Sequence, residues 1–389
     1  MGELIALDLP AGPGFVEALR RAWDGGDAVL PIDTRLPKVA TDRLLDVLRP
    51  ARVISPDGIH ALAGSVPTEP DDALVVATSG TTGEPKGVVH THASVAASAL
   101  STSAGLDVDP ARDRWVACLP LAHIGGLSVI TRSLVTGTPC TVLERFDPRA
   151  VEDEARRGAT LVSLVATVLE RTDVSGFRAV LLGGAAPPSV LPSNVVATYG
   201  MTETGSGCVY HGRALDGVEL RIGDGTLGSE GEVLVRGPML LRAYRYGTDG
   251  DGDGDGIDGA GIDPRIENGW FPTGDGGRLD EDGTLTIFGR MAEVIVTGAE
   301  KVWPGPVEEV LATHSSIAEV AVWKRADPVW GERVVAYVVV APGASLPELG
   351  DLRELVADRI ARWAAPRQLV VVDALPKTAS GKVRRADLV

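Results

Sequence analysis

One short segment limits the possible folds of this chain more than any other. An apolar run at residues 73–77 is followed directly by Thr78-Ser79-Gly80-Thr81-Thr82-Gly83-Glu84-Pro85-Lys86-Gly87. The apolar run predicts a buried strand, and the glycines allow backbone N–H groups of the next loop to approach an anion closely. Hydroxyl groups add donors, and Lys86 adds a compact positive charge. The segment therefore predicts a strand that ends in a phosphate-binding loop. The loop is not of the Walker A type, because Gly87 rather than Ser or Thr follows the lysine.

Length and composition exclude several classes of protein. A chain of 389 residues is expected to form two domains, and 44% hydrophobic with 23% charged residues is typical of a globular protein. The net charge of −16 argues against nucleic acid as the main partner. No apolar run approaches the roughly 20 residues of a membrane span, and the N-terminus has no signal-peptide pattern. Three cysteines without a spacing pattern predict a cytoplasmic protein without a disulfide framework or zinc site.

The order of apolar runs predicts an α/β fold. Expected helices at 14–23, 40–48 and 93–104 alternate with expected strands such as 52–54, 115–119 and 179–182. This alternation predicts a large domain of parallel sheets covered by helices. From Gly217 onward, closely spaced strands and glycine turns predict a small appended sheet, antiparallel or barrel-like.

The C-terminal part follows a different pattern. Helices near 306–313 and 349–363 and strands at 318–324 and 334–340 predict a small α+β domain. The expected domains are therefore residues 1–290 and 291–389. Alternating Asp and Gly at 249–256 invite a calcium-loop interpretation, but the carboxylate that an EF-hand needs is replaced by Ala260 or Ile262. This tract is therefore expected to be a flexible, solvated insertion.

Three further motifs follow the phosphate loop along the chain. They are Tyr199-Gly200-Met201-Thr202-Glu203-Thr204, then Trp270-Phe271-Pro272-Thr273-Gly274-Asp275 with Gly289-Arg290, and finally Lys377-Thr378-Ala379-Ser380-Gly381-Lys382. Carboxylate oxygen suits a hard cation such as Mg²⁺, and an aromatic ring suits a purine. Together the four motifs resemble those of the adenylate-forming enzymes, which include acyl- and aryl-CoA synthetases, luciferases and peptide-synthetase adenylation domains. The resemblance extends from Leu74 to Leu388.

The resemblance implies a role for individual residues. Lys86, Thr202, Glu203 and Lys382 would be catalytic, with Glu203 binding Mg²⁺ and Lys382 carried on a mobile small domain. The nucleotide would be bound by Thr78, Ser79, Gly80, Thr81, Thr82, Gly83, Lys86, Gly183, Gly184, Tyr199, Gly200, Thr202, Asp275 and Arg290. Tyr199 would stack on adenine, Asp275 would bind the ribose hydroxyls, and Gly298 would lie beside the coenzyme A chain. At the hinge, Ala292 stands where the family usually has Asp or Lys.

The substrate prediction depends on the segment Pro120-Leu121-Ala122-His123-Ile124-Gly125-Gly126-Leu127. His123 precedes an expected helix start and could receive an anionic group there, although a core or capping histidine would give the same pattern. Together with the short body before the phosphate loop and the segment 205–210, it makes the chain most similar to bacterial o-succinylbenzoate–CoA ligases of menaquinone biosynthesis. His123, Gly184 and Ser206 would then contact the substrate.

This resemblance implies ATP-dependent ligation of 2-succinylbenzoate to coenzyme A through an acyl-adenylate, with Mg²⁺, giving AMP and pyrophosphate. The partners would be small molecules, with no nucleic acid and no membrane span, and a homodimer stays open. Two alternatives also stay open. One is another aryl- or acyl-CoA ligase, and the other is a non-catalytic nucleotide-binding relative.

Overall fold

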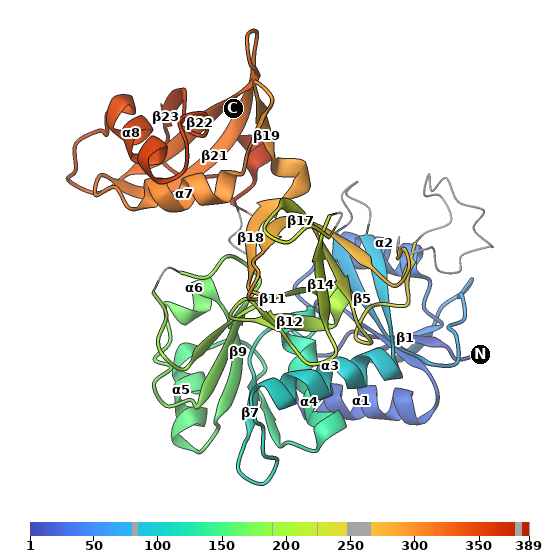
Figure 1. Ribbon diagram of the computed structural model, residues 1–389. Coiled ribbons are helices and arrows are strands. Elements are labelled where there is room, and N and C mark those ends of the chain that lie inside the picture. The colour runs from blue at the N-terminus through green and yellow to red at the C-terminus, as the bar shows by residue number, and fades with distance from the viewer. Residues whose placement is uncertain (80–84, 189, 224, 247–265, 378–382, 389) are drawn as a thin grey trace. The chain divides into compact units, whose positions relative to one another are not determined.

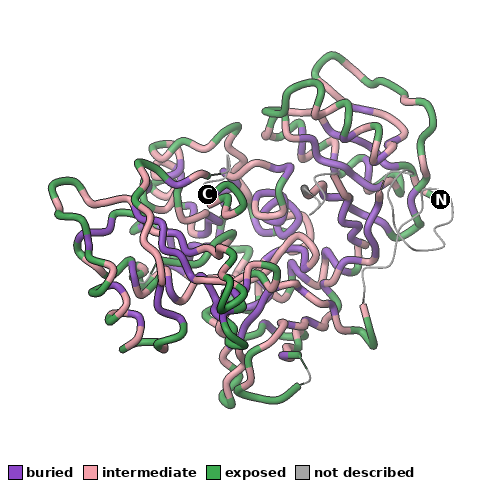
Figure 2. The backbone as a smooth tube through the Cα atoms, turned by 90° about the horizontal axis from the view of Figure 1, so that it is seen from above, coloured by how far each residue is buried: buried purple, intermediate pink, exposed green. Residues whose placement is uncertain are grey.

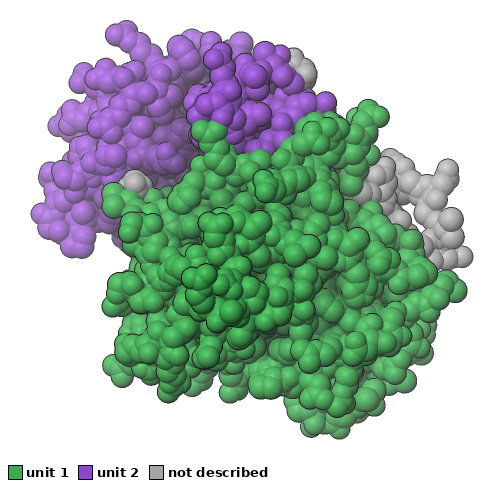
Figure 3. Space-filling model, turned by 60° about the horizontal axis from the view of Figure 1, so that its bottom comes forward, with its two compact units in different colours: residues 1–219, 235–271 green, residues 220–234, 272–389 purple. Residues whose placement is uncertain are grey.

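The computed structural model describes residues 1–389 except 80–84, 189, 224, 247–265, 378–382 and 389. The acidic tract 249–256 therefore lies outside the described residues. Contacts divide the chain into two compact units, coloured separately in Figure 3. Unit 1 comprises residues 1–219 and 235–271, and unit 2 comprises residues 220–234 and 272–389. The domains predicted from the sequence, 1–290 and 291–389, differ from these units in the placement of 220–234 and 272–290.

Unit 1 contains two seven-stranded sheets (Figure 1). The strands of the first are β1 (Leu4–Leu7), β2 (Ala28–Pro31), β3 (Arg52–Ser55), β4 (Gly58–Ala61), β5 (Asp72–Ser79), β6 (Pro85–Thr91) and β16 (Ala243–Arg245). Their order is β16-β6-β5-β2-β1-β3-β4. The four central strands β5, β2, β1 and β3 are parallel, whereas β4, β6 and β16 are paired antiparallel at the edges.

The second sheet has the same design. Its strands are β7 (Trp115–Ala117), β8 (Cys140–Val142), β9 (Leu161–Val165), β10 (Ala179–Gly183), β11 (Val195–Met201), β12 (Ser206–Tyr210) and β13 (Arg213–Ala214). Their order is β13-β12-β11-β10-β9-β7-β8, with β12 and β13 antiparallel at one edge. The parallel core that the sequence predicts is confirmed in both sheets. The antiparallel edges are an addition, and the edge at β6 arises because this strand folds back directly on β5.

Helices cover these sheets, as predicted. They are α1 (Pro13–Asp24), α2 (Lys38–Leu48), α3 (His92–Gly105), α4 (Ile124–Thr136), α5 (Pro148–Arg156) and α6 (Ala166–Leu169). One hydrophobic core joins side chains of both sheets, such as Leu74 and Trp115, to side chains of α1, α3 and α4, such as Leu19, Val95 and Leu127. Figure 2 shows the buried stretches of the chain in purple. No helix in the described ranges is long and apolar enough to cross a membrane.

Unit 2 contains most of a four-stranded sheet and a C-terminal α+β region. The four strands, in the order β14-β15-β17-β18, are Glu219–Ile222, Glu230–Arg236, Phe271–Leu279 and Leu285–Arg290. A five-stranded sheet follows, formed by β19 (Ile295–Thr297), β20 (Glu300–Val302), β21 (Ile317–Asp327), β22 (Gly331–Val340) and β23 (Gln368–Val371). Helices α7 (Pro304–Ala312) and α8 (Leu349–Arg359) pack on it through Val307, Leu311 and Leu352. The predicted C-terminal α+β pattern is confirmed.

Candidate active site

One face of β6 supports the short helical turn η1 (Thr202–Thr204). Side chains alternate along a strand, so Lys86, Val88 and His90 share a face of β6. Toward one end of that face, Lys86 Nζ lies 3.4 Å from Glu203 Oε1. Toward the other end, His90 Nε2 lies 2.7 Å from the Thr202 carbonyl oxygen. The strand therefore brings the lysine of the predicted phosphate loop to the carboxylate predicted to bind metal.

His90 supports the candidate site, and the sequence analysis did not single it out. Its side chain is fully buried, and this burial lowers the pKa of the imidazole, so the ring is neutral. A carbonyl oxygen only accepts hydrogen bonds, which means that Nε2 carries the proton and donates it to Thr202. Nδ1 lies 3.1 Å from Ser94 Oγ. His90 thus fixes the backbone of the turn that carries Glu203.

Tyr244 was also missed. It lies on β16, directly opposite Val88 of β6, so its side chain is on the face that holds Lys86. The Tyr244 hydroxyl donates a hydrogen bond of 2.9 Å to Glu203 Oε1. Lys86 Nζ lies 3.8 Å from the centroid of the Tyr244 ring. Three residues far apart in the sequence therefore form one compact contact set.

The hairpin of β11 and β12 fixes the other side of this turn. Gly200 is opposite Gly207, and a Cβ added at Gly200 would lie only 2.1 Å from the Ser206 carbonyl oxygen. Only glycine fits there. The Thr204 hydroxyl accepts a hydrogen bond from Met201 N and donates one to Ser206 O, at 2.9 and 2.7 Å. Tyr199 precedes Gly200 at a bulge, so the predicted nucleotide motif lies on a closely packed backbone.

The remaining nucleotide residues of unit 1 lie at strand ends. Thr78 is near the end of β5, where its Oγ1 lies 3.5 Å from the Lys86 carbonyl oxygen, and Ser79 is the last residue of that strand. Gly183 ends β10, and a Cβ there would lie 2.8 Å from Thr198 Oγ1. Gly184 follows with a φ of 86°. The predicted residues Gly80, Thr81, Thr82 and Gly83 lie outside the described residues.

His123 precedes the first residue of α4, as predicted, and belongs to a charged cluster. Its Nε2 lies 3.5 Å from Arg35 Nη2 and 3.7 Å from Asp33 Oδ2. Asp33 in turn binds the Arg35 guanidinium at 2.8 and 2.6 Å. Although 61% of the His123 side chain is exposed, desolvation by the surrounding protein lowers its pKa, with Asp33 opposing this effect. Ser206 is buried instead, with its hydroxyl 3.0 Å from that of Ser98.

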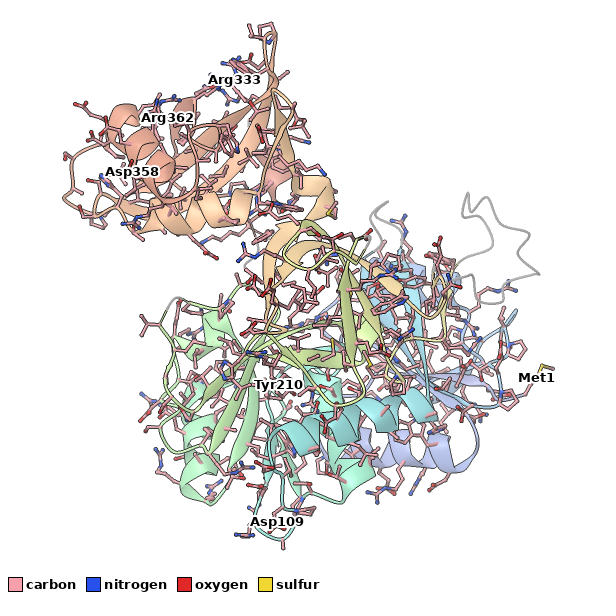
Figure 4. The ribbon with its side chains drawn as sticks, in the orientation of Figure 1. Met1, Asp109, Tyr210, Arg333, Asp358 and Arg362 are labelled. Carbon is pink, nitrogen blue, oxygen red and sulfur yellow. The ribbon has the colours of Figure 1, made fainter. Side chains whose placement is uncertain are left out.

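Arg132 is the third residue missed by the sequence analysis. It is the single charged residue of α4, and only 2% of it is exposed. Burial lowers the pKa of its guanidinium, while the electrostatic influence of Tyr210 on β12 opposes that shift. Figure 4 labels Tyr210, which is itself buried. The Arg132 Nε and Nη1 atoms have no hydrogen-bond partner among the described residues. A buried cation with unpaired donor nitrogens is able to receive an anion.

Two predicted nucleotide residues meet within unit 2. Asp275 on β17 is paired with Arg290 at the end of β18, and Arg290 Nε lies 3.0 Å from Asp275 Oδ1. Arg290 Nη1 also donates to the Thr273 carbonyl oxygen at 3.1 Å. Gly298 lies in the turn between β19 and β20 with a φ of 66°, and a Cβ there would come within 2.5 Å of the Trp330 ring. The predicted catalytic residue Lys382 lies outside the described residues.

The described residues contain no group of three or more His, Cys, Asp or Glu side chains that could hold a metal ion. Mg²⁺ does not need such a cage in nucleotide enzymes, because one or two carboxylates, substrate phosphates and water complete its octahedron. Glu203 is a partly buried carboxylate, 13% exposed, with Lys86 of the predicted phosphate loop beside it. This donor set fits a magnesium ion that arrives with a polyphosphate.

Comparisons with known proteins agree with these motifs. Residues 24–245 match the family model of the AMP-binding enzymes, and residues 306–382 match the model of the AMP-binding enzyme C-terminal domain. A probable 2-succinylbenzoate–CoA ligase from Mycobacterium tuberculosis is 39% identical over 383 residues, which cover 92% of this chain and 95% of that protein. A 2-succinylbenzoate–CoA ligase from Listeria innocua is 34% identical over 343 residues, covering 81% and 69% of the two chains.

Solved structures of enzymes with related names are also similar to this chain. The o-succinylbenzoate CoA synthetase from Bacillus subtilis, in complex with its acyl-adenylate intermediate, superposes with a TM-score of 0.80 at 29% identity. That match covers 100% of this chain and 88% of the other. The same enzyme in complex with ATP and magnesium ion also gives 0.80, at 28% identity, with 100% and 89% covered.

Proposed function

This chain belongs to the AMP-binding enzyme family and is an adenylate-forming acid–thiol ligase, and on this premise we propose that it joins 2-succinylbenzoate to coenzyme A. In the first half-reaction a carboxylate oxygen of the acid attacks the α-phosphorus of ATP, and pyrophosphate leaves. In the second, the thiol of coenzyme A attacks the acyl carbon, and AMP leaves with the electrons of the broken acyl–oxygen bond. The proposal is supported by relatives that carry this activity in their names.

In unit 1 we assign the phosphates to Lys86 and the metal to Glu203, which the structure places 3.4 Å apart. A bound Mg²⁺ would neutralise charge on the phosphates as the α-phosphorus is attacked. The chain itself contributes a positive lysine beside the phosphates. It also contributes a turn at Thr202 whose backbone carbonyl is held by a hydrogen bond from neutral His90. These groups are organised before the reaction, so little reorganisation is needed as charge develops.

In unit 2 we assign Asp275 and Arg290 to the ribose. An ionised carboxylate accepts hydrogen bonds from two neighbouring hydroxyls well, and the arginine 3.0 Å away keeps Asp275 oriented. We also assign Lys382 to the reacting carboxylate and α-phosphate, and Gly298 to the coenzyme A chain. Both assignments are supported by the motifs that contain these residues.

One observation carries the choice of a diacid, namely the buried Arg132, whose nitrogens Nε and Nη1 have no partner among the described residues. An isolated buried charge costs several kcal/mol unless a partner compensates it. Benzoate and fatty acids have one carboxylate, which is consumed at the phosphate. An aromatic diacid has a second carboxylate to pair with the guanidinium. The aromatic ring of 2-succinylbenzoate would also suit the apolar surroundings of Arg132, which include Trp115 with its ring centroid at 5.4 Å.

A panel of carboxylic acids tests this proposal. Pyrophosphate release would be measured with ATP, Mg²⁺ and, in turn, 2-succinylbenzoate, benzoate and a medium-chain fatty acid. We expect 2-succinylbenzoate to be preferred by at least about a hundredfold in kcat/KM, the ratio produced by loss of one hydrogen-bonded charge pair. Equal turnover of benzoate would favour another aryl-CoA ligase. Absence of an acyl-adenylate with every acid would favour a non-catalytic nucleotide-binding protein.

A further inference from the structure

Three contacts hold Glu203, and two of them come from β16 and the residues just before it. The Glu203 carbonyl oxygen accepts a hydrogen bond of 2.8 Å from Leu241 N. Its side chain accepts one from the Tyr244 hydroxyl at 2.9 Å and faces Lys86 Nζ at 3.4 Å. Tyr244 is only 8% exposed and packs against Val88 and Phe271. A tyrosine fixed in this way presents its hydroxyl from one direction only.

Both side-chain contacts use the same carboxylate oxygen, Oε1. The second oxygen is therefore not needed to hold Glu203 in place. Lys86 has a flexible stem, and a polyphosphate would attract its ammonium group strongly. Once Lys86 turns to the phosphates, the hydroxyl of Tyr244 still binds Oε1. The carboxylate then keeps its orientation although its cationic partner has moved.

The Tyr244 ring has a separate effect on Lys86. The ammonium nitrogen lies 3.8 Å from the ring centroid, within the range of a cation–π interaction. The ring carries no net charge. It can therefore stay in contact with the Lys86 ammonium group whether the anion beside the lysine is Glu203 or a phosphate. One side chain thus contacts both the lysine and the carboxylate assigned to the nucleotide.

We propose that Tyr244 is a positioning residue that holds Glu203 for the metal through its hydroxyl and Lys86 for the phosphates through its ring. The inference rests on the proposed function, because it takes Glu203 as the magnesium ligand. The two parts of the side chain can be separated by mutation. Tyr244→Phe removes the hydroxyl and keeps the ring, whereas Tyr244→Leu removes both.

The test measures binding rather than turnover. Calorimetric titrations would give the affinity for ATP without metal and the affinity for Mg²⁺ in the presence of ATP, with no carboxylic acid present. Tyr244→Phe should weaken Mg²⁺ binding about tenfold, the effect of losing one hydrogen bond to a charged group, and change metal-free ATP affinity less than about twofold. Tyr244→Leu should in addition weaken metal-free ATP binding about fivefold through loss of the cation–π contact.

Two reference variants make the result specific. Tyr337→Phe removes a hydroxyl from another buried tyrosine, which accepts a hydrogen bond from Arg325 in unit 2, and should leave both affinities unchanged. Glu203→Gln should weaken Mg²⁺ binding at least as much as Tyr244→Phe. Mg²⁺ affinity that is unchanged in Glu203→Gln overturns the metal assignment and this inference with it. An effect in Glu203→Gln without one in Tyr244→Phe, or an equal effect in Tyr337→Phe, overturns the positioning role alone.

Discussion

Two arginines among the described residues of unit 1 are buried, and their surroundings differ in one decisive respect. Arg245 on β16 is 5% exposed, and Arg132 on α4 is 2% exposed. Arg245 donates hydrogen bonds of 2.6 to 3.3 Å to the carbonyl oxygens of Leu48, Arg49, Val66 and Pro67. Burial lowers its pKa to about 10, so it stays charged at neutral pH. Arg132 has two donor atoms without a partner among the described residues.

From this difference we infer that Arg245 is a structural cation, and we propose that Arg132 is a binding one. Buried polar groups in folded proteins are nearly always hydrogen-bonded, and a group that is not requires an explanation. Arg245 ties a loop and a helix end to β16 and needs no further partner. Arg132 has the same burial but lacks that compensation, and an anionic ligand would supply it. Burial alone therefore does not mark a candidate binding residue, and the unpaired donors are what make Arg132 a candidate.

The largest expected effect concerns Arg245. Replacing it with methionine keeps much of the apolar stem but removes the guanidinium donor from four backbone carbonyl oxygens. We expect Arg245→Met to lower the free energy of unfolding by about 4 kcal/mol, measured by urea denaturation, because each lost charge-assisted bond costs on the order of 1 kcal/mol or more. The remaining folded protein should keep its kcat/KM. A loss below about 1 kcal/mol would remove the distinction between the two arginines.

The next effect concerns Arg132, and it should fall on activity instead. Arg132→Met should lower kcat/KM for 2-succinylbenzoate about a hundredfold, or ~2.7 kcal/mol. The free energy of unfolding of the ligand-free protein should not decrease, because replacing an uncompensated buried charge by an apolar side chain is often neutral or stabilising. Steady-state kinetics and urea denaturation of the same preparation would check both parts. A loss of stability as large as that of Arg245→Met would show that Arg132 is structural.

His90 is a third buried basic group, and it differs from both arginines because it is neutral. Burial favours the deprotonated imidazole. Its folded-state pKa is lowered mainly by burial, so below about pH 6.5 the unfolded chain binds a proton that the folded chain does not. Stability contributed by neutral His90 is therefore complete above that pH and is lost as the pH falls. The free energy of unfolding should decrease by up to about 1.4 kcal/mol per pH unit.

The variant His90→Gln isolates this contribution. A glutamine amide can still donate to the Thr202 carbonyl oxygen but does not titrate. The difference in unfolding free energy between the original chain and the variant should shrink as the pH is lowered from 7 to 5. Parallel pH profiles for the two proteins would contradict the assignment of a neutral, buried His90.

The local sequence pattern predicted the elements in which apolar residues recur with the spacing of a helix or form the short apolar run of a buried strand. The buried positions Phe15, Leu19 and Ala22 define α1, and the apolar run 179–182 defines β10. Strand β6 was not predicted, because Pro85 and Gly87 are poor strand residues in isolation. Its existence depends on pairing with β5 on one side and with β16, far along the chain, on the other.

The candidate site shows the same division. Lys86, Glu203, Asp275 and Arg290 were predicted individually from motifs, and the structure places them in contact as two pairs. Tyr244 and His90 could not be predicted, since their roles arise from contacts across β6 to distant residues. Arg132 did leave a signal. It is the single charged residue within the otherwise uncharged α4. A charged residue on a buried helix is almost always paired, so this position predicts a charged partner.

We propose that Arg132 recognises the second carboxylate of an aromatic diacid in an adenylate-forming reaction. The most direct measurement is a cycle that combines a protein change with a substrate change. Acyl-adenylate formation would be followed by pyrophosphate release for the original chain and for Arg132→Met. Each would be supplied with 2-succinylbenzoate and with its analogue in which the succinyl carboxylate is a methyl ester.

We expect esterification to lower kcat/KM about a hundredfold for the original chain but less than about threefold for Arg132→Met. This difference corresponds to a coupling of roughly 2 kcal/mol between the two groups. Equal losses on esterification in both proteins would show that Arg132 and the carboxylate act independently, and would contradict the claim.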